Sequence, residues 1–237
     1  MLFARVAAGF VASRLAASDD PRFTNELWTA IEALYQKTLA HPFLKGLADG
    51  TLPRARFEFY LKQDALYLGA FAQVLNVIAS KSPREDWART LAQHAIDSIK
   101  EKESLHETIL KGVALKDGGA RMAPTNYAYT NHLLATAQRG TFAEGLAAVL
   151  PCYWIYQEVG KDLKKRGSKN AAYKRWIDNY SDPAYGASVQ AVLRMMNSEA
   201  THLSTREKAR CKDLFVTSAR YEFMFWEMAW RLEEWLP

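Results

Sequence analysis

The amino-acid sequence predicts an all-α fold in a single domain. Apolar residues recur at intervals of three and four along most of the chain, which is the spacing that gives an α-helix one apolar face. No segment of the sequence alternates apolar and polar residues in the manner of a half-buried β-strand. Glycine accounts for 12 of the 237 residues, which is few for a protein built from strands and turns.

The first two helices are predicted from periodicity and from the residues that precede them. A cluster of Ser, Asp and Pro stands before the first helix, which spans residues 23–40. His41 and Pro42 then predict a turn, followed by an irregular segment that contains glycine. Residues 53–80 form the second predicted helix, because proline suits a first turn and a long apolar stripe follows it.

Start and stop signals predict the remaining helices. These cover residues 85–111, 124–139, 141 onward, 172–180, 184–203 and 205–235. The helix that begins at Thr141 contains Pro151, which removes one backbone hydrogen bond and should bend the helix beside Cys152. The total is roughly seven or eight helices, more than a simple four-helix bundle requires.

Charge and hydropathy narrow the classes of partner. The net charge of +5 is small beside 31 basic and 26 acidic residues, so nucleic acid is not an expected partner. The basic residues between Lys161 and Arg175 are typical of a solvated helix end, with a phosphate-binding site as the alternative. No run of 18 apolar residues exists in the sequence, and we therefore expect no membrane span.

The cysteines and the N-terminal segment bear on localisation. Cys152 and Cys211 lack the spacing of a zinc site or a disulfide framework, which indicates a reducing compartment and a cytoplasmic protein. Residues 1–22 contain no acid before Asp19 and many small apolar residues. They are predicted to be an extension or a loosely attached helix, and a targeting peptide is the alternative.

Cys152 is the first candidate for a chemical role. A thiolate is a strong nucleophile, and an aromatic-rich, bent helix could both expose and orient it. The alternative is a small buried apolar residue, which is the commoner situation for an isolated cysteine. Cys211 lies between charged residues and is expected at the surface.

Two carboxyl groups are set among aromatic residues. Burial of Glu222 among its aromatic neighbours should raise its pKa, which suits a proton donor, whereas Glu227 is expected on a solvated face. Asp64 and Tyr67 share one helix face and could bind a flat heterocycle, with Asp64 accepting from an exocyclic amine. The alternative for each carboxyl is a structural hydrogen bond inside the protein.

A di-iron site is a further alternative. Glu103 with His106 and Glu199 with His202 have the Glu-x-x-His spacing that di-iron helical proteins use twice. Such a site also needs two more inward-facing carboxylates, and the second pair resembles a polar helix end. We therefore predict no metal site.

Five strings occur in order along the chain: HPFLKGLADGTLP, QDALYL, PTNYAYTNHL, LPCYWIYQEVG and YEFMFWEMA. Together they resemble the TenA family of thiaminase II enzymes over nearly everything after residue 22. The resemblance implies a haem oxygenase-like helical bundle for residues 23–237, assembled as a homotetramer. It also implies a reaction that needs neither metal nor organic cofactor.

The same resemblance assigns roles to residues of this chain. It implies that Cys152 is the nucleophile and Glu222 the principal acid and base. Asp64 would anchor the pyrimidine amine and ring nitrogen, and the substrate-binding tyrosines would be Tyr67, Tyr129, Tyr156 and Tyr180.

The implied reaction is hydrolysis at the exocyclic methylene of an aminopyrimidine. The expected product is 4-amino-5-hydroxymethyl-2-methylpyrimidine, formed from the 5-aminomethyl compound or from thiamine, and the sequence does not rank these two substrates. A pyrimidine-binding regulatory protein without turnover and a di-iron oxygenase on the same scaffold are the competing hypotheses.

Overall fold

The computed structural model describes residues 22–108 and 121–237, with side chains for all of these except 104–108. The predicted extension over residues 1–22 therefore lies almost entirely outside the described residues. The described ranges contain nine α-helices: α1 (Phe23–Leu39), α2 (Pro42–Asp49), α3 (Arg54–Ser80), α4 (Glu85–Thr108), α5 (Pro124–Arg139), α6 (Phe142–Lys164), α7 (Ala171–Tyr180), α8 (Pro183–Ala200) and α9 (Thr205–Arg231).

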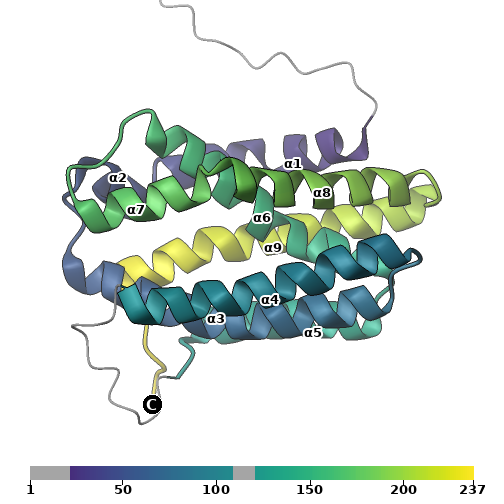
Figure 1. Cartoon of the computed structure of the whole chain (residues 1–237), viewed down its shortest axis with the longest axis horizontal. Coiled ribbons are helices and arrows are strands. Elements are labelled where there is room, and N and C mark those ends of the chain that lie inside the picture. The colour runs from purple at the N-terminus through teal and green to yellow at the C-terminus, as the bar shows by residue number, and fades with distance from the viewer. Residues whose placement is uncertain (1–21, 109–120) are drawn as a thin grey trace, which may run out of the picture.

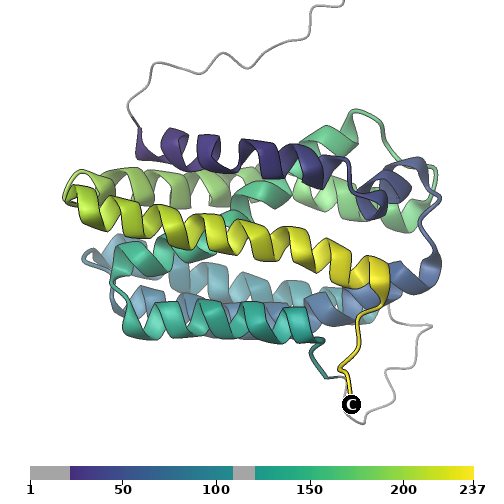
Figure 2. The same ribbon diagram turned by 180° about the vertical axis from the view of Figure 1, so that it is seen from behind.

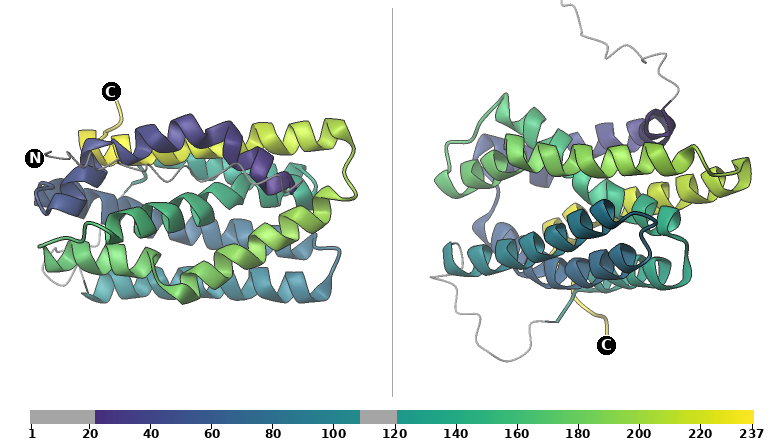
Figure 3. Two further views of the ribbon diagram at one scale, coloured as in Figure 1. Left: turned by 90° about the horizontal axis from the view of Figure 1, so that it is seen from above. Right: turned by 45° about the vertical axis from the view of Figure 1, so that its right-hand side comes forward.

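The helices form a layered bundle whose long members run roughly along one axis (Figures 1 and 3). Helices α3, α4 and α5 pack together on one side, and α1, α7 and α8 lie on the other (Figures 1 and 2). Between them lie α6 and α9, which contact each other and helices of both sides. The all-α prediction is confirmed.

Local sequence signals explain where several helices begin. Thr141 and Ser204 each form a capping box with a glutamate three residues later, and Asn170 and Asp182 accept backbone N–H groups of α7 and α8. These contacts satisfy donors that a helix start leaves unpaired. The closing helix ends at Arg231, earlier than the predicted residue 235.

Helix α2 was not expected. Residues 42–49 were predicted to be a turn and an irregular segment, but they form two turns of helix that begin with Pro42. Nδ1 of His41 accepts the backbone N–H of Phe43, and Gly50 ends the helix in the left-handed conformation at φ 77°. Proline at a first helical position and glycine just past the end are ordinary helix boundaries.

Helix α6 is the most deeply buried element that concerns the site. Its segment from Leu146 to Leu150 is at most 1% exposed, because α6 contacts α5, α7, α8 and α9. A helix that is apolar on all sides belongs in the interior of a protein. The segment thereby places the next residues, Pro151 and Cys152, in the middle of the bundle.

The prediction for Cys211 was wrong. This residue was predicted at the surface, yet it is 1% exposed. Cys211 begins a stripe at intervals of three and four that continues through Leu214, Phe215 and Ser218 on the buried face of α9. Its charged neighbours Arg210 and Lys212 point elsewhere, since adjacent helical residues lie on different faces.

None of the helices within residues 22–108 and 121–237 is long and apolar enough to cross a membrane. The basic residues between Lys161 and Arg175 are exposed, as expected of a solvated helix end. Several of them pair with nearby acids: Lys161 with Glu158, Lys165 with Asp162, and Lys174 with Asp178.

Candidate active site

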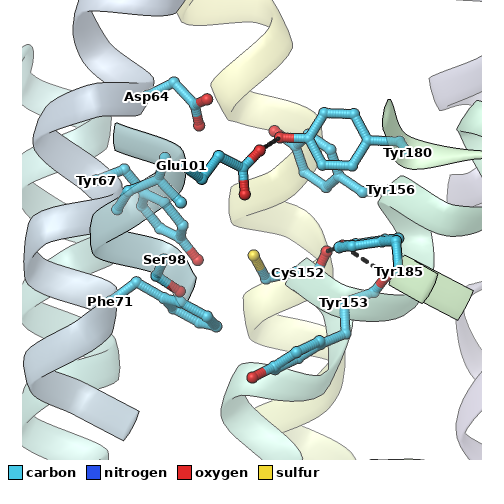
Figure 4. Close-up of a pocket in the computed structure, with 11 residues that line it drawn as sticks. Asp64, Tyr67, Phe71, Ser98, Glu101, Cys152, Tyr153, Tyr156, Tyr180 and Tyr185 are labelled. Atoms are coloured by element: carbon cyan, nitrogen blue, oxygen red, sulfur yellow. Dashed lines mark hydrogen bonds between the residues drawn. The ribbon is translucent and has the colours of Figure 1, made fainter. Parts of the chain in front are cut away.

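A pocket opens between the two sides of the bundle, with about 420 Å³ of empty space, part of which is open to solvent. Helices α3, α4 and α6 and the residues around the α7–α8 junction form its walls (Figure 4). The residues that line it are Asp64, Tyr67, Leu68, Phe71, Ser98, Glu101, Cys152, Tyr153, Tyr156, Tyr180 and Tyr185. The walls are therefore mostly aromatic, with a few polar groups, which is typical of a site for a small flat ligand.

Cys152 lines the pocket from α6 and lies near its centre (Figure 4). Its side chain is partly accessible, and the sulfur points toward the side of the pocket from which Tyr67, Ser98 and Glu101 extend (Figure 4). The Tyr185 hydroxyl donates to the backbone oxygens of Cys152 and Tyr153, at 3.3 and 3.1 Å. That contact joins the start of α8 to the turn of α6 that carries the cysteine.

The electrostatic surroundings of Cys152 oppose ionisation. Burial raises the pKa of the Cys152 thiol well above its usual value, and the carboxyl of Glu222 raises it further. The Tyr67 hydroxyl has the opposite effect on that pKa, because it can donate to the sulfur. These surroundings therefore favour the protonated form of the thiol.

Tyr67 presents an unsatisfied group to this region. Its hydroxyl is buried and has no hydrogen-bond partner among the described residues. The ring is held by Phe71 and Tyr129, with ring centroids 5.4 and 5.3 Å away. A fixed and unpaired buried hydroxyl beside a cysteine is suited to contact a ligand.

Glu222 lies on α9 and is 2% exposed. The Tyr129 hydroxyl donates a 2.6 Å hydrogen bond to its Oε1 atom. Burial raises the pKa of Glu222 to about 8, and the bond from Tyr129 limits that rise. Neither residue is among those that line the pocket, but the Tyr129 ring contacts that of Tyr67 at a centroid distance of 5.3 Å, so the pair lies directly behind that wall.

Asp64 faces the pocket from α3 and is 4% exposed. The structure records no hydrogen bond of its carboxyl to the described residues. Burial raises the pKa of Asp64 well above its usual value, and the carboxyls of Glu101 and Glu222 raise it further. Burial of such a carboxyl without a partner lowers the stability of the fold, unless a ligand supplies a hydrogen-bond donor or a positive charge.

Tyr156 belongs to an aromatic cluster at the inner end of the pocket. Its hydroxyl accepts from that of Tyr60 at 3.3 Å, and its ring lies against Trp176, Tyr180 and Trp226. Tyr60 and Trp226 stack with ring centroids 5.3 Å apart and an angle of 9° between their planes. The cluster is fully packed, so Tyr156 and Tyr180 have little freedom to move.

Glu101 was not among the residues predicted for the site. It extends from α4 between Asp64 and Tyr180 (Figure 4). Its Oε1 atom accepts from Nδ2 of Asn179 at 3.0 Å and from the Tyr180 hydroxyl at 3.3 Å. A signal existed in the sequence, because Glu101 continues the helical spacing of His94 and Ser98 along the half-buried face of α4.

The Glu-x-x-His pairs do not meet at this pocket as far as the structure describes them. His202 is exposed beyond the end of α8, Glu103 is exposed, and the side chain of His106 lies outside the described residues. In the described part of the chain, no three His, Cys, Asp or Glu side chains are arranged to hold a metal ion. Glu227, expected on a solvated face, is partly exposed and contacts His41 and Arg231.

Comparison with known proteins identifies the family. The family model TENA/THI-4/PQQC matches residues 28–232, which is most of the chain. The chain belongs to this family. A Bacillus subtilis member named aminopyrimidine aminohydrolase is 33% identical over 217 residues, covering 90% of this chain and 92% of its own length. A protein of the same name from Halalkalibacterium halodurans is 32% identical over 218 residues, covering 90% and 97%.

Two solved structures show the same fold. A TenA homologue from Pyrococcus horikoshii OT3 superposes with a TM-score of 0.80 at 32% identity, covering 89% of this chain and 99% of that one. A Shewanella denitrificans domain with a heme oxygenase-like fold gives a TM-score of 0.65 at 12% identity, covering 88% and 92%. That likeness concerns the fold alone, and it confirms the predicted haem oxygenase-like bundle.

Proposed function

We propose that this chain is an aminopyrimidine aminohydrolase of thiamine salvage. The substrates are 4-amino-5-aminomethyl-2-methylpyrimidine and thiamine, and the product of both is the 5-hydroxymethyl pyrimidine. The observation that carries the proposal is the sulfur of Cys152 facing a ring-walled, acidic pocket, in a chain whose relatives bear that enzyme name. We expect the enzyme to be a homotetramer.

The pocket provides what a pyrimidine ring requires. The aromatic side chains form flat apolar walls, against which a heterocycle stacks. The Asp64 carboxyl has no hydrogen-bond partner among the described residues and accepts from the 4-amino group of the ligand. The hydroxyls of Tyr180 and Tyr156 contact the edge of the pyrimidine ring. This arrangement relieves the cost of burying Asp64, because the ligand supplies the missing donors.

The chemistry begins at Cys152. The sulfur forms a bond to an electron-poor ring carbon while Glu222 gives its proton to the ring system, and the thiol proton then replaces it on the Glu222 carboxylate. The electron-rich adduct then expels ammonia, or the thiazole of thiamine, from the exocyclic methylene. Water adds to that methylene and loses a proton, the carbon–sulfur bond breaks, and the aromatic ring and free thiol are restored.

Protonation states in the structure support these roles. With a pKa of about 8, Glu222 holds a proton at neutral pH and can donate it. Its bond from Tyr129 fixes the carboxyl, so no reorganisation is needed when the ring gains electrons. The Tyr67 hydroxyl lies beside the sulfur of Cys152 and stabilises the negative charge that develops on that sulfur.

Ammonia release from the aminomethylpyrimidine, with thiamine as a second substrate, tests the proposal. We expect wild type to turn over at least one of them, and Asp64→Asn to lower kcat/KM about 100-fold by replacing one of the two acceptor oxygens with a donor. The matched control is Asp213→Asn, an exposed aspartate of α9. Tight binding of a pyrimidine by folded wild type without product would contradict the proposal and favour a binding or regulatory protein.

A further inference from the structure

Among the described residues, the pocket is lined by acidic side chains without basic ones. Two of its lining side chains are carboxyls, Asp64 and Glu101, and none of the described residues that line it is Lys, Arg or His. Glu222 lies directly behind the wall, where it is bonded to Tyr129, whose ring contacts that of Tyr67. Burial raises the pKa of Glu101, as it does those of Asp64 and Glu222, and a cation bound among these carboxyls stabilises their ionised forms.

Of these three carboxyls, Glu101 is the one without a role in the proposed reaction. Asp64 binds the pyrimidine ring, and Glu222 is bonded to Tyr129 and acts on protons. Glu101 uses its Oε1 atom for Asn179 and Tyr180, and the structure records no bond from its Oε2 atom to the described residues. The side chain is thus held in place and retains one free oxygen atom.

The position of Glu101 fits a contact with the part of the substrate that leaves. It extends from α4 into the pocket opposite α6, where Cys152 lies, and its charge influences both Cys152 and Asp64 (Figure 4). A ring held by Asp64 and approached by Cys152 therefore has its neighbouring substituent within the field of Glu101. In the two proposed substrates that substituent bears a positive charge, as an ammonium or a thiazolium group.

We propose that Glu101 is a specificity-determining residue that selects pyrimidines with a cationic leaving group over neutral analogues. This inference rests on the proposed function and adds a basis for selection to it. Substrate and product differ in this respect, because the hydroxymethyl product is neutral. Glu101 consequently favours binding of the substrate over retention of the product.

A purely structural role for Glu101 makes a different prediction. If Glu101 served only to accept from Asn179 and Tyr180, glutamine at this position would retain that acceptor and change nothing. If it served to position Tyr180, its loss would weaken cationic and neutral ligands alike. Selection by charge predicts that Glu101→Gln weakens the cation alone, because this substitution keeps the shape and removes the charge.

Calorimetric binding at pH 7 tests the inference, in the Cys152→Ser background so that no turnover occurs. The ligands are the aminomethyl and hydroxymethyl pyrimidines, which differ mainly in charge. We expect Glu101→Gln to raise the Kd of the aminomethyl compound about tenfold or more and that of the hydroxymethyl compound less than about twofold. Glu103→Gln, an exposed site on the same helix, should change neither Kd.

Two outcomes would overturn the inference alone: weakening of both ligands by the same factor, or no change in either Kd. Tyr180→Phe distinguishes a positioning effect, since it removes a contact of Glu101 but keeps its charge, and we expect it to retain the preference for the cation. If the Cys152→Ser protein with Glu101 intact binds neither pyrimidine, the proposed function fails and this inference fails with it.

Discussion

The Tyr129 hydroxyl donates a 2.6 Å hydrogen bond to Oε1 of Glu222, and both side chains are at most 2% exposed. The two residues come from α5 and α9, so the contact joins two helices behind the pocket wall. Burial raises the pKa of Glu222, and this bond limits the rise. The pair therefore links the stability of the bundle to the protonation of Glu222.

Removal of the Tyr129 hydroxyl tests this link. We expect Tyr129→Phe to lower the free energy of unfolding by about 1–2 kcal/mol, because a buried carboxyl loses its donor. The pKa of Glu222 should rise further, since the lost bond favoured the ionised form. Urea denaturation at pH 7 measures the loss. Tyr127→Phe, an exposed tyrosine of the same helix, is the control, and an equal effect there would contradict the account.

The raised pKa of Glu222 predicts a pH dependence of stability. The folded chain keeps the Glu222 proton up to about pH 8, whereas the unfolded chain loses it near the usual value of 4.5. The folded state thus binds more protons between these values, and the contribution of Glu222 to stability falls as pH rises through that window. Glu222→Gln removes this cost and should be more stable than wild type by on the order of 3 kcal/mol at pH 8.

Thermal or urea denaturation of both proteins at pH 4.5, 6 and 8 measures this difference. It should be small at pH 4.5 and grow toward pH 8. A difference that does not change with pH across this range would show that Glu222 ionises normally in the folded protein.

The position of the Tyr67 hydroxyl beside the sulfur of Cys152 predicts the reactivity of the thiol (Figure 4). In a Cys211→Ala background, alkylation of Cys152 by iodoacetamide at pH 7 should be slower than that of a free cysteine, because burial raises its pKa. Tyr67→Phe should slow it about three- to tenfold more, since the hydroxyl lowers that pKa. Tyr153→Phe is the control from the same pocket, and an equal or greater effect there would refute a specific role for Tyr67.

At Gly160, α6 packs closely against the backbone of Tyr180. A β-carbon at Gly160 would lie 2.7 Å from the carbonyl carbon of Tyr180, which is too close for any real contact. We expect Gly160→Ala to destabilise the fold by about 1–3 kcal/mol and to weaken pyrimidine binding, because the end of α7 must shift. At Gly69 the nearest atom to a β-carbon is the Lys102 amine at 3.6 Å, so Gly69→Ala should change neither property. Denaturation and calorimetry of both variants check this.

Much of the fold could be predicted because helix periodicity and capping are local properties of the sequence. The prediction failed where a local signal had two meanings. Pro42 was interpreted as a turn, although proline also begins helices, and α2 is short enough that its apolar spacing is hard to recognise. Cys211 was judged by its charged neighbours, although the residues three and four positions away decide which face is buried.

The site was harder to predict, because it depends on which helix faces meet. The structure brings Asp64, Tyr67, Cys152, Tyr156 and Tyr180 to one pocket and places Tyr129 and Glu222 behind it. Their roles remain predictions. Glu101 and Tyr185 were missed, because each acts with residues of a distant helix and neither belongs to the strings that carried the resemblance.

The most direct test of the account is ammonia release by Cys152→Ser, measured beside wild type and Cys211→Ser at equal concentrations of folded protein. The account predicts that serine at position 152 lowers kcat by at least about 1,000-fold, because the nucleophile is lost, while Cys211→Ser retains turnover per folded molecule. Turnover by Cys152→Ser within about tenfold of wild type would contradict a covalent role for this cysteine. It would favour direct attack by water on a substrate bound in the same pocket.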